Sequence, residues 1–292
     1  PDIQAGQVIE EQMRWVPSIG LTFSMRMDGF AWMFAMLVTG IGMLVALYAR
    51  YYMSKDDPVP RFFSFFLAFM GAMLGVVLSG NLIQLVIFWE LTSVTSFLLI
   101  GLWHTRSAAR DGAMKAFLVS ALGCLGLLAA VAMIGLAGGS TSLSGLNVDA
   151  LRASPLFTPA LLLTLLAAFT KSAQLPFHLW LPTAMEAPTP VSAFLHSATM
   201  VKAGVFLVAK FGLLFGASAL WGGITVPVGL ATLVWGAWLA LRQTDLKALL
   251  PESARRAYDV HPLVEQLLDS GEVQELHGRW APNIVTTLGR MG

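Results

Sequence analysis

Long apolar runs, separated by short polar segments, fill the chain between residues 29 and 250. A helix needs about 20 consecutive apolar residues to cross a bilayer. The candidates are Gly29–Ala49, Phe62–Ser79, Leu82–Trp103, Ala113–Ala137, Pro159–Leu181, Pro190–Phe211 and Ala219–Leu241. The fifth run contains Pro176, which lacks an amide donor and interrupts a helix. The pattern predicts an all-α, polytopic transmembrane bundle of about seven spans, one of them discontinuous.

The density of charged residues divides the chain into parts. The first 250 residues hold 25 charged side chains, about 10%, whereas the last 42 hold 10, about 24%. We expect a polar N-terminal segment (1–28), a transmembrane domain (29–250) and a soluble tail (251–292). The chain begins with Pro1, and no secretory signal precedes the first apolar run. We expect this start to be a cut, a processed end or an incomplete gene.

Composition excludes several classes of protein. Hydrophobic residues make up 56% of the chain and charged residues 12%, about half the share in an ordinary soluble domain. The net charge of +1 offers no basic field for nucleic acid. Cys124 is the one cysteine, which excludes a disulfide framework and a cysteine-rich metal site. We expect a protein of the lipid bilayer with no metal, no cofactor and no catalytic residue of its own.

Basic residues predict how the spans are oriented. With seven spans, the segment Arg50–Arg61, the pair Arg106 and Arg110, and the pair Arg242 and Lys247 all fall on one side of the membrane. The connections on the other side carry few charges. Basic loops face the cytoplasm in most membrane proteins. We therefore expect a multi-pass protein of the inner (plasma) membrane with its basic loops in the cytoplasm.

Three ionisable residues lie close to the centres of their spans: Glu90, Lys171 and Lys202. Each costs about 2.5–3.5 kcal/mol at mid-bilayer, so such groups are retained where they pair or line a water path. A structural ion pair is one interpretation, and ion or proton handling is the other. If Glu90 and Lys171 approach each other, a change in their separation changes how tightly the lysine holds its proton.

Two further patterns extend this polar set. Lys171 lies five residues before Pro176, and His178 lies two residues after it, so titratable groups flank the expected helix break. His196, Thr199 and Lys202 recur at i, i+3 and i+6, within one broad sector of a helix, and predict a polar track. Lys115 lies near the start of its span, from which its side chain can reach the cytoplasmic interface. Lys115 and Thr199 are accessory candidates.

Three segments carry a family resemblance. Residues 88–103 (beginning Phe-Trp-Glu-Leu-Thr-Ser) resemble the fifth helix of Mrp antiporter and complex I proton-pumping subunits. Residues 171–182 (Lys-Ser-Ala-Gln-Leu-Pro-Phe-His-Leu-Trp-Leu-Pro) resemble their broken seventh helix, and residues 187–204 their eighth. Two features favour the large A subunit of the multisubunit sodium/proton antiporter over the L subunit of NADH–quinone oxidoreductase. They are the Trp-Glu-Leu-Thr-Ser sequence of the first motif and the lysine at position 202. The resemblance covers about residues 10–250.

The resemblance implies a role for each candidate residue. Glu90 would be the paired carboxylate and Lys171 the central lysine that it modulates. His178, His196 and Lys202 would extend a proton relay across the membrane plane. No redox centre or cofactor belongs to this subunit in the family.

The resemblance also implies a fold and partners. The fold would be the first of two inverted five-helix repeats, and the first span here would be the family's third. The partners would be other membrane subunits of an antiporter complex, protons and a monovalent cation, with Na⁺ favoured. We expect little transport by this chain without the second repeat. The alternatives are a proton-pumping module of complex I and a purely structural membrane scaffold.

The tail carries a second, shorter resemblance. Residues 257–269 and 279–290 are similar to the middle of a carboxyltransferase beta subunit of acyl-CoA carboxylase. The loops that bind the oxyanion and the acyl-CoA do not occur in it, so the resemblance implies no such activity. A true fusion and an artefact of joining two genes are both compatible with the sequence.

Overall fold

The computed structural model describes residues 8–16, 21–54 and 57–242. Its helices confirm an all-α membrane-type bundle. Their bounds are α1 Gly29–Tyr52, α2 Val59–Leu78, α3 Leu82–Ile100, α4 Ser107–Gly138, α5 Val148–Ala153, α6 Phe157–Lys171, α7 Trp180–Ala184, α8 Thr189–Ser192, α9 Met200–Phe215 and α10 Ala219–Arg242. Short 3₁₀ and π segments, η2 Phe177–Leu179 and η3 Ala193–Thr199, connect some of them. The predicted tail 251–292 lies outside the described residues.

Six stretches of the described helices are long and apolar enough to cross a membrane. Five are the single helices α1, α2, α3, α4 and α10, and the sixth is the continuous stretch Thr189–Phe215, which joins α8, η3 and α9. The remaining predicted span begins with α6, an apolar helix of 15 residues that stops at Lys171. The expected discontinuous helix is therefore α6 followed by η2 and α7.

A β-hairpin precedes α1, an element that the search for apolar runs did not predict. Strands β1 (Ile9–Val16) and β2 (Leu21–Met27) pair antiparallel, with Ile9 opposite Met27. The hairpin packs against the bundle, because the Ser24 amide donates to Gln84 Oε1 (2.8 Å) and an isolated bridge joins Met25 to Ser79. In β2 the polar residues alternate with apolar ones, a period of two that a window of about 20 residues averages out.

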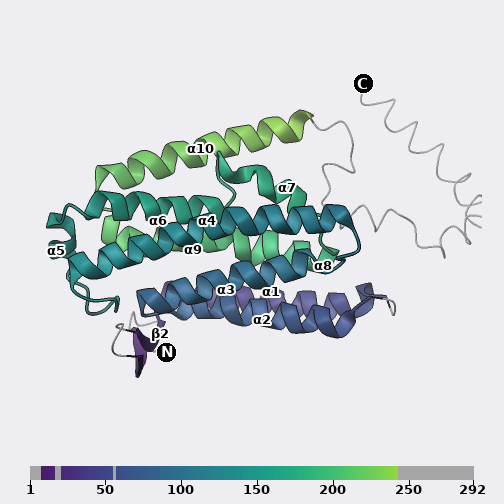
Figure 1. Cartoon of the computed structure of the whole chain (residues 1–292), viewed down its shortest axis with the longest axis horizontal. Coiled ribbons are helices and arrows are strands. Elements are labelled where there is room, and N and C mark those ends of the chain that lie inside the picture. Colours follow the sequence, from purple (N-terminus) through teal and green to yellow (C-terminus); the bar gives the residue numbers. More distant parts are fainter. Residues whose placement is uncertain (1–7, 17–20, 55–56, 243–292) are drawn as a thin grey trace, which may run out of the picture. The chain divides into compact units, whose positions relative to one another are not determined.

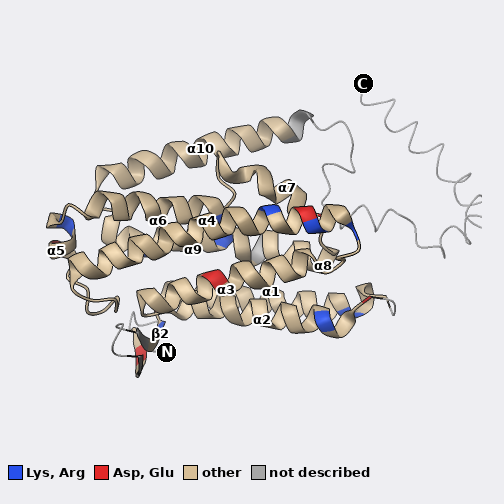
Figure 2. Cartoon of the chain, viewed as in Figure 1, with Lys and Arg blue, Asp and Glu red and all other residues tan. Residues whose placement is uncertain are grey.

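The loops sort to two ends of the bundle as the basic residues predict. At the basic end, Trp103 Nε1 donates to Asp57 Oδ1 (2.9 Å), which joins the α1–α2 and α3–α4 connections. At the other end, a bridge joins Asn81 to Ser142, and the Gly80 amide donates to the Ser24 carbonyl. Figure 2 shows most charged residues near the ends of the helices and few along their middle.

The helices form three groups that set the position of α6. Figure 1 shows α1, α2 and α3 on one side, α4, α6 and α9 in the middle, and α10 on the other side. α6 packs against both α4 and α9, so its end lies in the interior. Close approach to α9 needs Gly204, where an added Cβ would overlap the Ala168 carbonyl oxygen of α6. Small residues at such crossings let two backbones approach in a membrane.

We expect Gly204→Ala to destabilise the bundle, because a methyl group there overlaps the backbone of α6. Overpacking of this kind costs about 1–3 kcal/mol. The matched control is Gly71→Ala on α2, where nothing lies within 4 Å of an added Cβ. The measurement is thermal unfolding of the full chain in detergent micelles. Equal midpoints for the two variants would contradict the tight α6–α9 contact.

Candidate functional site

Lys171 is the last residue of α6, and its side chain is fully buried. It is among the largest completely enclosed side chains of the described residues. Because α6 stops here, the lysine lies in the interior, where α6 packs between α4 and α9. An ammonium so placed needs oxygen partners, since burial of an unpaired charge is costly. The interior position agrees with the place of Lys171 within an apolar run of the sequence.

Helix α3 supplies those partners. Lys171 Nζ donates to Ser93 Oγ at 2.7 Å and to the Trp89 carbonyl oxygen at 3.4 Å, and it lies 5.3 Å from the centre of the Trp89 ring. The Ser93 hydroxyl itself donates to the Trp89 carbonyl at 3.3 Å, which leaves its oxygen lone pairs to accept from the lysine. A hydroxyl, a carbonyl and an aromatic face thus surround the ammonium.

Glu90 lies on the same helix but makes no direct ion pair with Lys171. The ion pairs among the described residues do not include these two, so the carboxylate and the ammonium are more than 4 Å apart. Glu90 Oε2 is buried without a hydrogen-bond partner in the described structure. The sequence left open whether Glu90 and Lys171 touch, and in this conformation they form no ion pair.

The chain breaks directly after Lys171. The backbone turns at Ala173, which has a positive φ of 50°, and a cis peptide joins Leu175 to Pro176. Trp180 Nε1 donates to the Thr170 carbonyl at 3.0 Å, which satisfies one group that the missing helical turn leaves free. Ser172 Oγ donates to the Val201 carbonyl at 2.6 Å and so ties the break to α9. Pro176 predicted the break, and the structure confirms it.

His196 lies in η3, where the backbone is wound as a π-helix. Both ring nitrogens are buried without a well-formed hydrogen bond among the described residues, and the ring has a weak polar contact with the backbone of Ala184. Its ring centre is 6.1 Å from that of Trp180, the residue that binds the Thr170 carbonyl. Thr199 is fully buried, and its hydroxyl donates to the Phe194 carbonyl at 2.7 Å. His196 therefore has unused hydrogen-bonding capacity close to the end of α6.

His178 lies on the far side of the break and faces α10. Its ring centre is 6.4 Å from that of Trp235, and its Nδ1 is buried without a partner in the described structure. Nearby, the Leu175 amide donates to Thr232 Oγ1 of α10 at 3.1 Å. The break thus brings one histidine toward α10, whereas the other lies in η3.

Two predicted lysines lie apart from this interior. Lys202 of α9 and Lys115 of α4 are both exposed on the described helices. For Lys115 this agrees with the expected interfacial position. Lys202 lies on the outer face of α9, because the π-helical turn of η3 offsets the helical spacing that placed it in one track with His196 and Thr199. The structure brings Lys171, Glu90 and Trp180 together, but it does not bring Lys202 to them.

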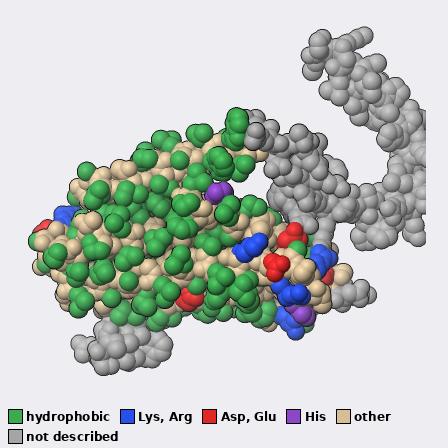
Figure 3. Space-filling view, turned by 45° about the horizontal axis from the view of Figure 1, so that its top comes forward, with side chains coloured by type: hydrophobic (Ala, Val, Ile, Leu, Met, Phe, Trp, Pro, Cys, Tyr) green, Lys and Arg blue, Asp and Glu red, His purple; other side chains and the backbone are tan. Residues whose placement is uncertain are grey.

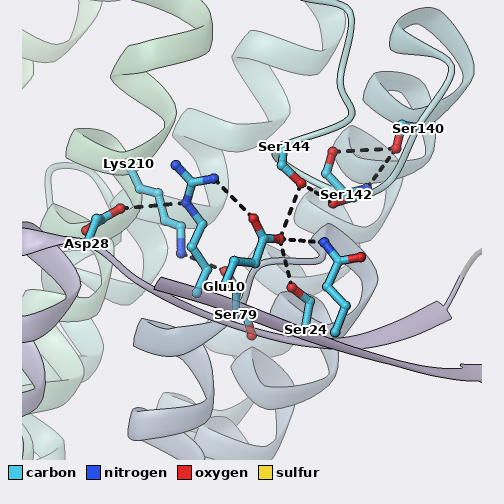
Figure 4. A network of polar contacts seen from close by, with 10 residues as sticks. Glu10, Ser24, Asp28, Ser79, Ser140, Ser142, Ser144 and Lys210 are labelled. Carbon is cyan, nitrogen blue, oxygen red and sulfur yellow. Dashed lines mark hydrogen bonds and ion pairs between the residues drawn. The ribbon is translucent and has the colours of Figure 1, made fainter. Parts of the chain in front are cut away.

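A second polar cluster, which sequence reasoning missed, lies where the hairpin meets the end of the bundle (Figure 4). Glu10 accepts hydrogen bonds from Ser24 and Ser144 at 3.0 and 3.3 Å and lies 3.7 Å from Arg26. Lys210 Nζ donates to the Ser79 carbonyl at 2.8 Å. The alternation of residues 21–27 predicts strand β2, but no sequence pattern predicts the contact of Glu10 with the distant Ser144.

Three protein-family models match the chain. The model described as NADH:quinone oxidoreductase/Mrp antiporter, TM, matches residues 79–254. The model described as NADH-Ubiquinone oxidoreductase (complex I), chain 5 N-terminus, matches residues 15–63. A carboxyl transferase domain model matches residues 236–292. The antiporter resemblance is confirmed, and for the tail a carboxyl transferase domain is matched, without the subunit being specified.

Individual relatives cover most of this chain. It is 56% identical over 255 residues to a probable A/B subunit of the K⁺/H⁺ antiporter of Rhizobium meliloti, covering 87% of the chain and 26% of the relative. It is 51% identical over 248 residues to the A subunit of the Na⁺/H⁺ antiporter of Alkalihalophilus pseudofirmus, covering 84% of the chain and 31% of the relative.

A solved structure is also similar. The Mrp complex from Dietzia sp. DQ12-45-1b matches with a TM-score of 0.78 and 36% identity, over 83% of this chain and 27% of that one. The chain thus spans between 26% and 31% of the length of the relatives described here.

We expect Ser93→Ala to destabilise the fold, because it removes the nearest oxygen partner of the buried Lys171 ammonium. An unsatisfied buried charged group costs about 1–3 kcal/mol or more. The matched control is Ser96→Ala on the same helix, whose hydroxyl donates to the Ser93 carbonyl and is equally buried. The measurement is denaturant unfolding in mixed micelles. In a Lys171→Met background the two alanine variants should become equivalent, and a persistent difference would refute the assigned contact.

Proposed function

The chain belongs to the family of membrane subunits shared by NADH:quinone oxidoreductase and Mrp antiporters, and from this membership we propose that it is part of an antiporter subunit that exchanges a monovalent cation for protons. The observation that carries the proposal is the buried Lys171, enclosed by the polar face of α3 at the point where α6 breaks. A protein that needed only a stable bundle would gain nothing from this residue, since removing an isolated charge from a membrane interior saves free energy.

The chemistry that we propose is the reversible binding of one proton at Lys171 Nζ. Burial favours the neutral amine, and a nearby carboxylate favours the charged ammonium. Glu90 is more than 4 Å from the lysine here, and its Oε2 has no partner among the described residues. Movement of this carboxylate toward the ammonium would hold the proton, and movement away would release it to water or to a neighbouring acceptor.

His196 and His178 are the acceptors that we propose next to Lys171. Both have buried ring nitrogens without well-formed hydrogen bonds in the described structure, and an imidazole can accept a proton on one nitrogen while it donates from the other. The two histidines lie on different sides of the break, near Trp180 and Trp235. A proton leaving Lys171 would therefore have two directions open to it. Thr199 would assist by holding the π-helical turn that presents His196.

We propose that Lys202 and Lys115 take part in later steps of the proton relay, after the histidines. Lys202 is exposed on α9, so a relay through it requires further protein to cover that face. Such protein is available in the relatives, which are about three to four times as long as the matched region. Lys115 lies exposed on α4 and would exchange protons with the aqueous phase at the basic end.

The partners and the orientation complete the proposal. The relatives described above include K⁺/H⁺ and Na⁺/H⁺ antiporter subunits, and the similar structure is that of a complex. We propose Na⁺ as the cation, other membrane subunits of an Mrp-type complex as partners, and a cell-membrane location with the basic end of the bundle in the cytoplasm. Proton-pumping subunits of NADH–quinone oxidoreductase belong to the same family. The relatives described above are antiporter subunits, however, which favours antiport.

Lys171→Ala should abolish exchange in the assembled complex, because no other group among the described residues of the break can hold the proton at that position. We expect at least a tenfold loss of Na⁺-driven proton movement, corresponding to about 1.4 kcal/mol or more. The measurement uses everted membrane vesicles that contain the complete antiporter complex, with this chain in place inside its full-length subunit. The control is Arg152→Gln on α5, an exposed residue that is paired with Asp149 of its own helix, which should keep full activity.

The structural-scaffold interpretation gives a different result in the same assay. It requires Lys171→Ala vesicles to exchange ions at the unmodified rate, provided that the complex assembles in equal amount. Immunodetection of a second protein of the complex in the same vesicles measures assembly. Full exchange by an assembled Lys171→Ala complex would refute the proposed role of the lysine.

A further inference from the structure

A cavity of about 370 Å³ opens at the basic end of the bundle, between α2, α3 and α4. Neither Lys171 nor Glu90 lines it, and it plays no part in the proton relay. Its lining combines Arg61, His104 and Arg110 with mainly apolar residues, among them Phe97 and Met114. The composition is unusual for an interhelical gap, because three basic side chains stand beside a wall that is otherwise apolar.

The basic side chains come from two separate segments of the chain. Arg61 lies in the first turn of α2, whereas His104 and Arg110 flank the start of α4. All three are exposed, so none is neutralised by burial against a partner helix. One N–H of Arg110 donates to the His104 carbonyl at 2.8 Å, which fixes the guanidinium at the mouth of the cavity. A guanidinium has five N–H groups, so several remain for a ligand.

The neighbouring charges leave this mouth basic. Asp57 accepts hydrogen bonds from Trp103 Nε1 and from Ser54, so its carboxylate is already engaged at the interface. Asp111 follows Arg110 and is exposed. Arg106 lies over the Trp103 ring at 4.4 Å and adds a further positive charge close by. Figure 3 shows basic side chains and a histidine, with some acidic side chains between them, gathered at one end of the described helices, beside the apolar side.

The apolar wall continues along the outside of the bundle. Met114 begins a stripe on α4 that runs through Leu118 and Leu122, which are 48%, 60% and 53% exposed. On α3 a second stripe passes through Val94 and Leu91, both exposed. Residues three or four apart share one face of a helix. A phospholipid has a charged headgroup at the membrane interface and apolar acyl chains toward the bilayer centre. The basic groups and the apolar stripes follow the same order.

We propose that this cavity binds an anionic phospholipid, with its phosphate held by Arg61, His104 and Arg110 and its acyl chains lying along the stripes of α3 and α4. Basic pockets between membrane helices on the cytoplasmic side favour anionic headgroups. Trp103 lies at the same level, as aromatic residues do at the membrane interface. The volume suits a headgroup and the first methylenes, and the exposed stripes accommodate the rest. The site is independent of the proposed antiport.

The experiment is native mass spectrometry of the full chain, released from micelles that contain a defined lipid. The probes are phosphatidylglycerol, which is anionic, phosphatidylcholine, which is zwitterionic, and soluble glycerol phosphate. We expect one phosphatidylglycerol to remain bound in preference to the other two. Each interfacial basic residue contributes about 1 kcal/mol, so Arg61→Gln together with Arg110→Gln should weaken phosphatidylglycerol binding about 30-fold.

The matched control is Arg50→Gln, an exposed arginine of α1 outside the cavity, which should change the affinity by less than about twofold. Equal binding of phosphatidylcholine, or equal loss in the control, would overturn the proposal. Equal affinity for glycerol phosphate would assign the site to a soluble phosphate and overturn the choice of a lipid.

A second measurement does not depend on any variant. A phosphatidylglycerol with a photoreactive group on its acyl chain should label the unmodified chain at α3 and α4, near Phe97 and Met114. Labelling of α10 or α1 with none at these helices would refute the placement even if the charge variants lost affinity by failing to fold.

Discussion

The need to give a buried ammonium its oxygen partners organises the centre of this bundle. Lys171 is enclosed completely, and α3 supplies a hydroxyl and a carbonyl on the side that faces it. Those groups are in position because the α3 hydroxyls donate to their own helix and leave their oxygens free to accept. The charge therefore fixes the facing side of α3 and the point where α6 ends. Packing of apolar residues alone would fix neither.

The broken helix follows from the same requirement. If α6 continued beyond Lys171, its next turns would run past the polar face of α3. Lys171 would then be buried against further turns of α6 itself. Because α6 ends at Lys171, the backbone can turn; Trp180 satisfies the Thr170 carbonyl, and the hydrogen bond from Ser172 Oγ to the Val201 carbonyl ties the turn to α9. The π-helical turn of η3 lies on the other side of Trp180 and leaves His196 without a well-formed hydrogen bond among the described residues. Two irregular segments thus meet at one indole ring.

The sequence predicted the parts of this structure that depend on composition along a single helix. Spans, the sorting of loops to two ends, the break at Pro176 and the buried Lys171 all follow from apolar length, charge and proline chemistry. The separation of Glu90 from Lys171 does not, since it depends on how α3 and α6 pack against α4. The outward direction of Lys202 also could not be predicted, because it depends on the extra residue of a π-helical turn. The hairpin was not predicted because its alternation is short and confined to β2.

Helix α10 has a mechanical consequence for this interior. Its membrane-spanning window is only 6% buried, and it is anchored at its start, where Trp221 stacks on Phe215 at 5.4 Å. Farther along, its described contacts with the break are the Leu175–Thr232 hydrogen bond and the His178–Trp235 ring contact. Because the described contacts along most of α10 are few, a displacement of this helix about its start would break little packing. Helix displacements of this kind occur within microseconds to milliseconds. Since the Trp235 ring lies against the His178 ring, such a displacement would change the surroundings of that histidine.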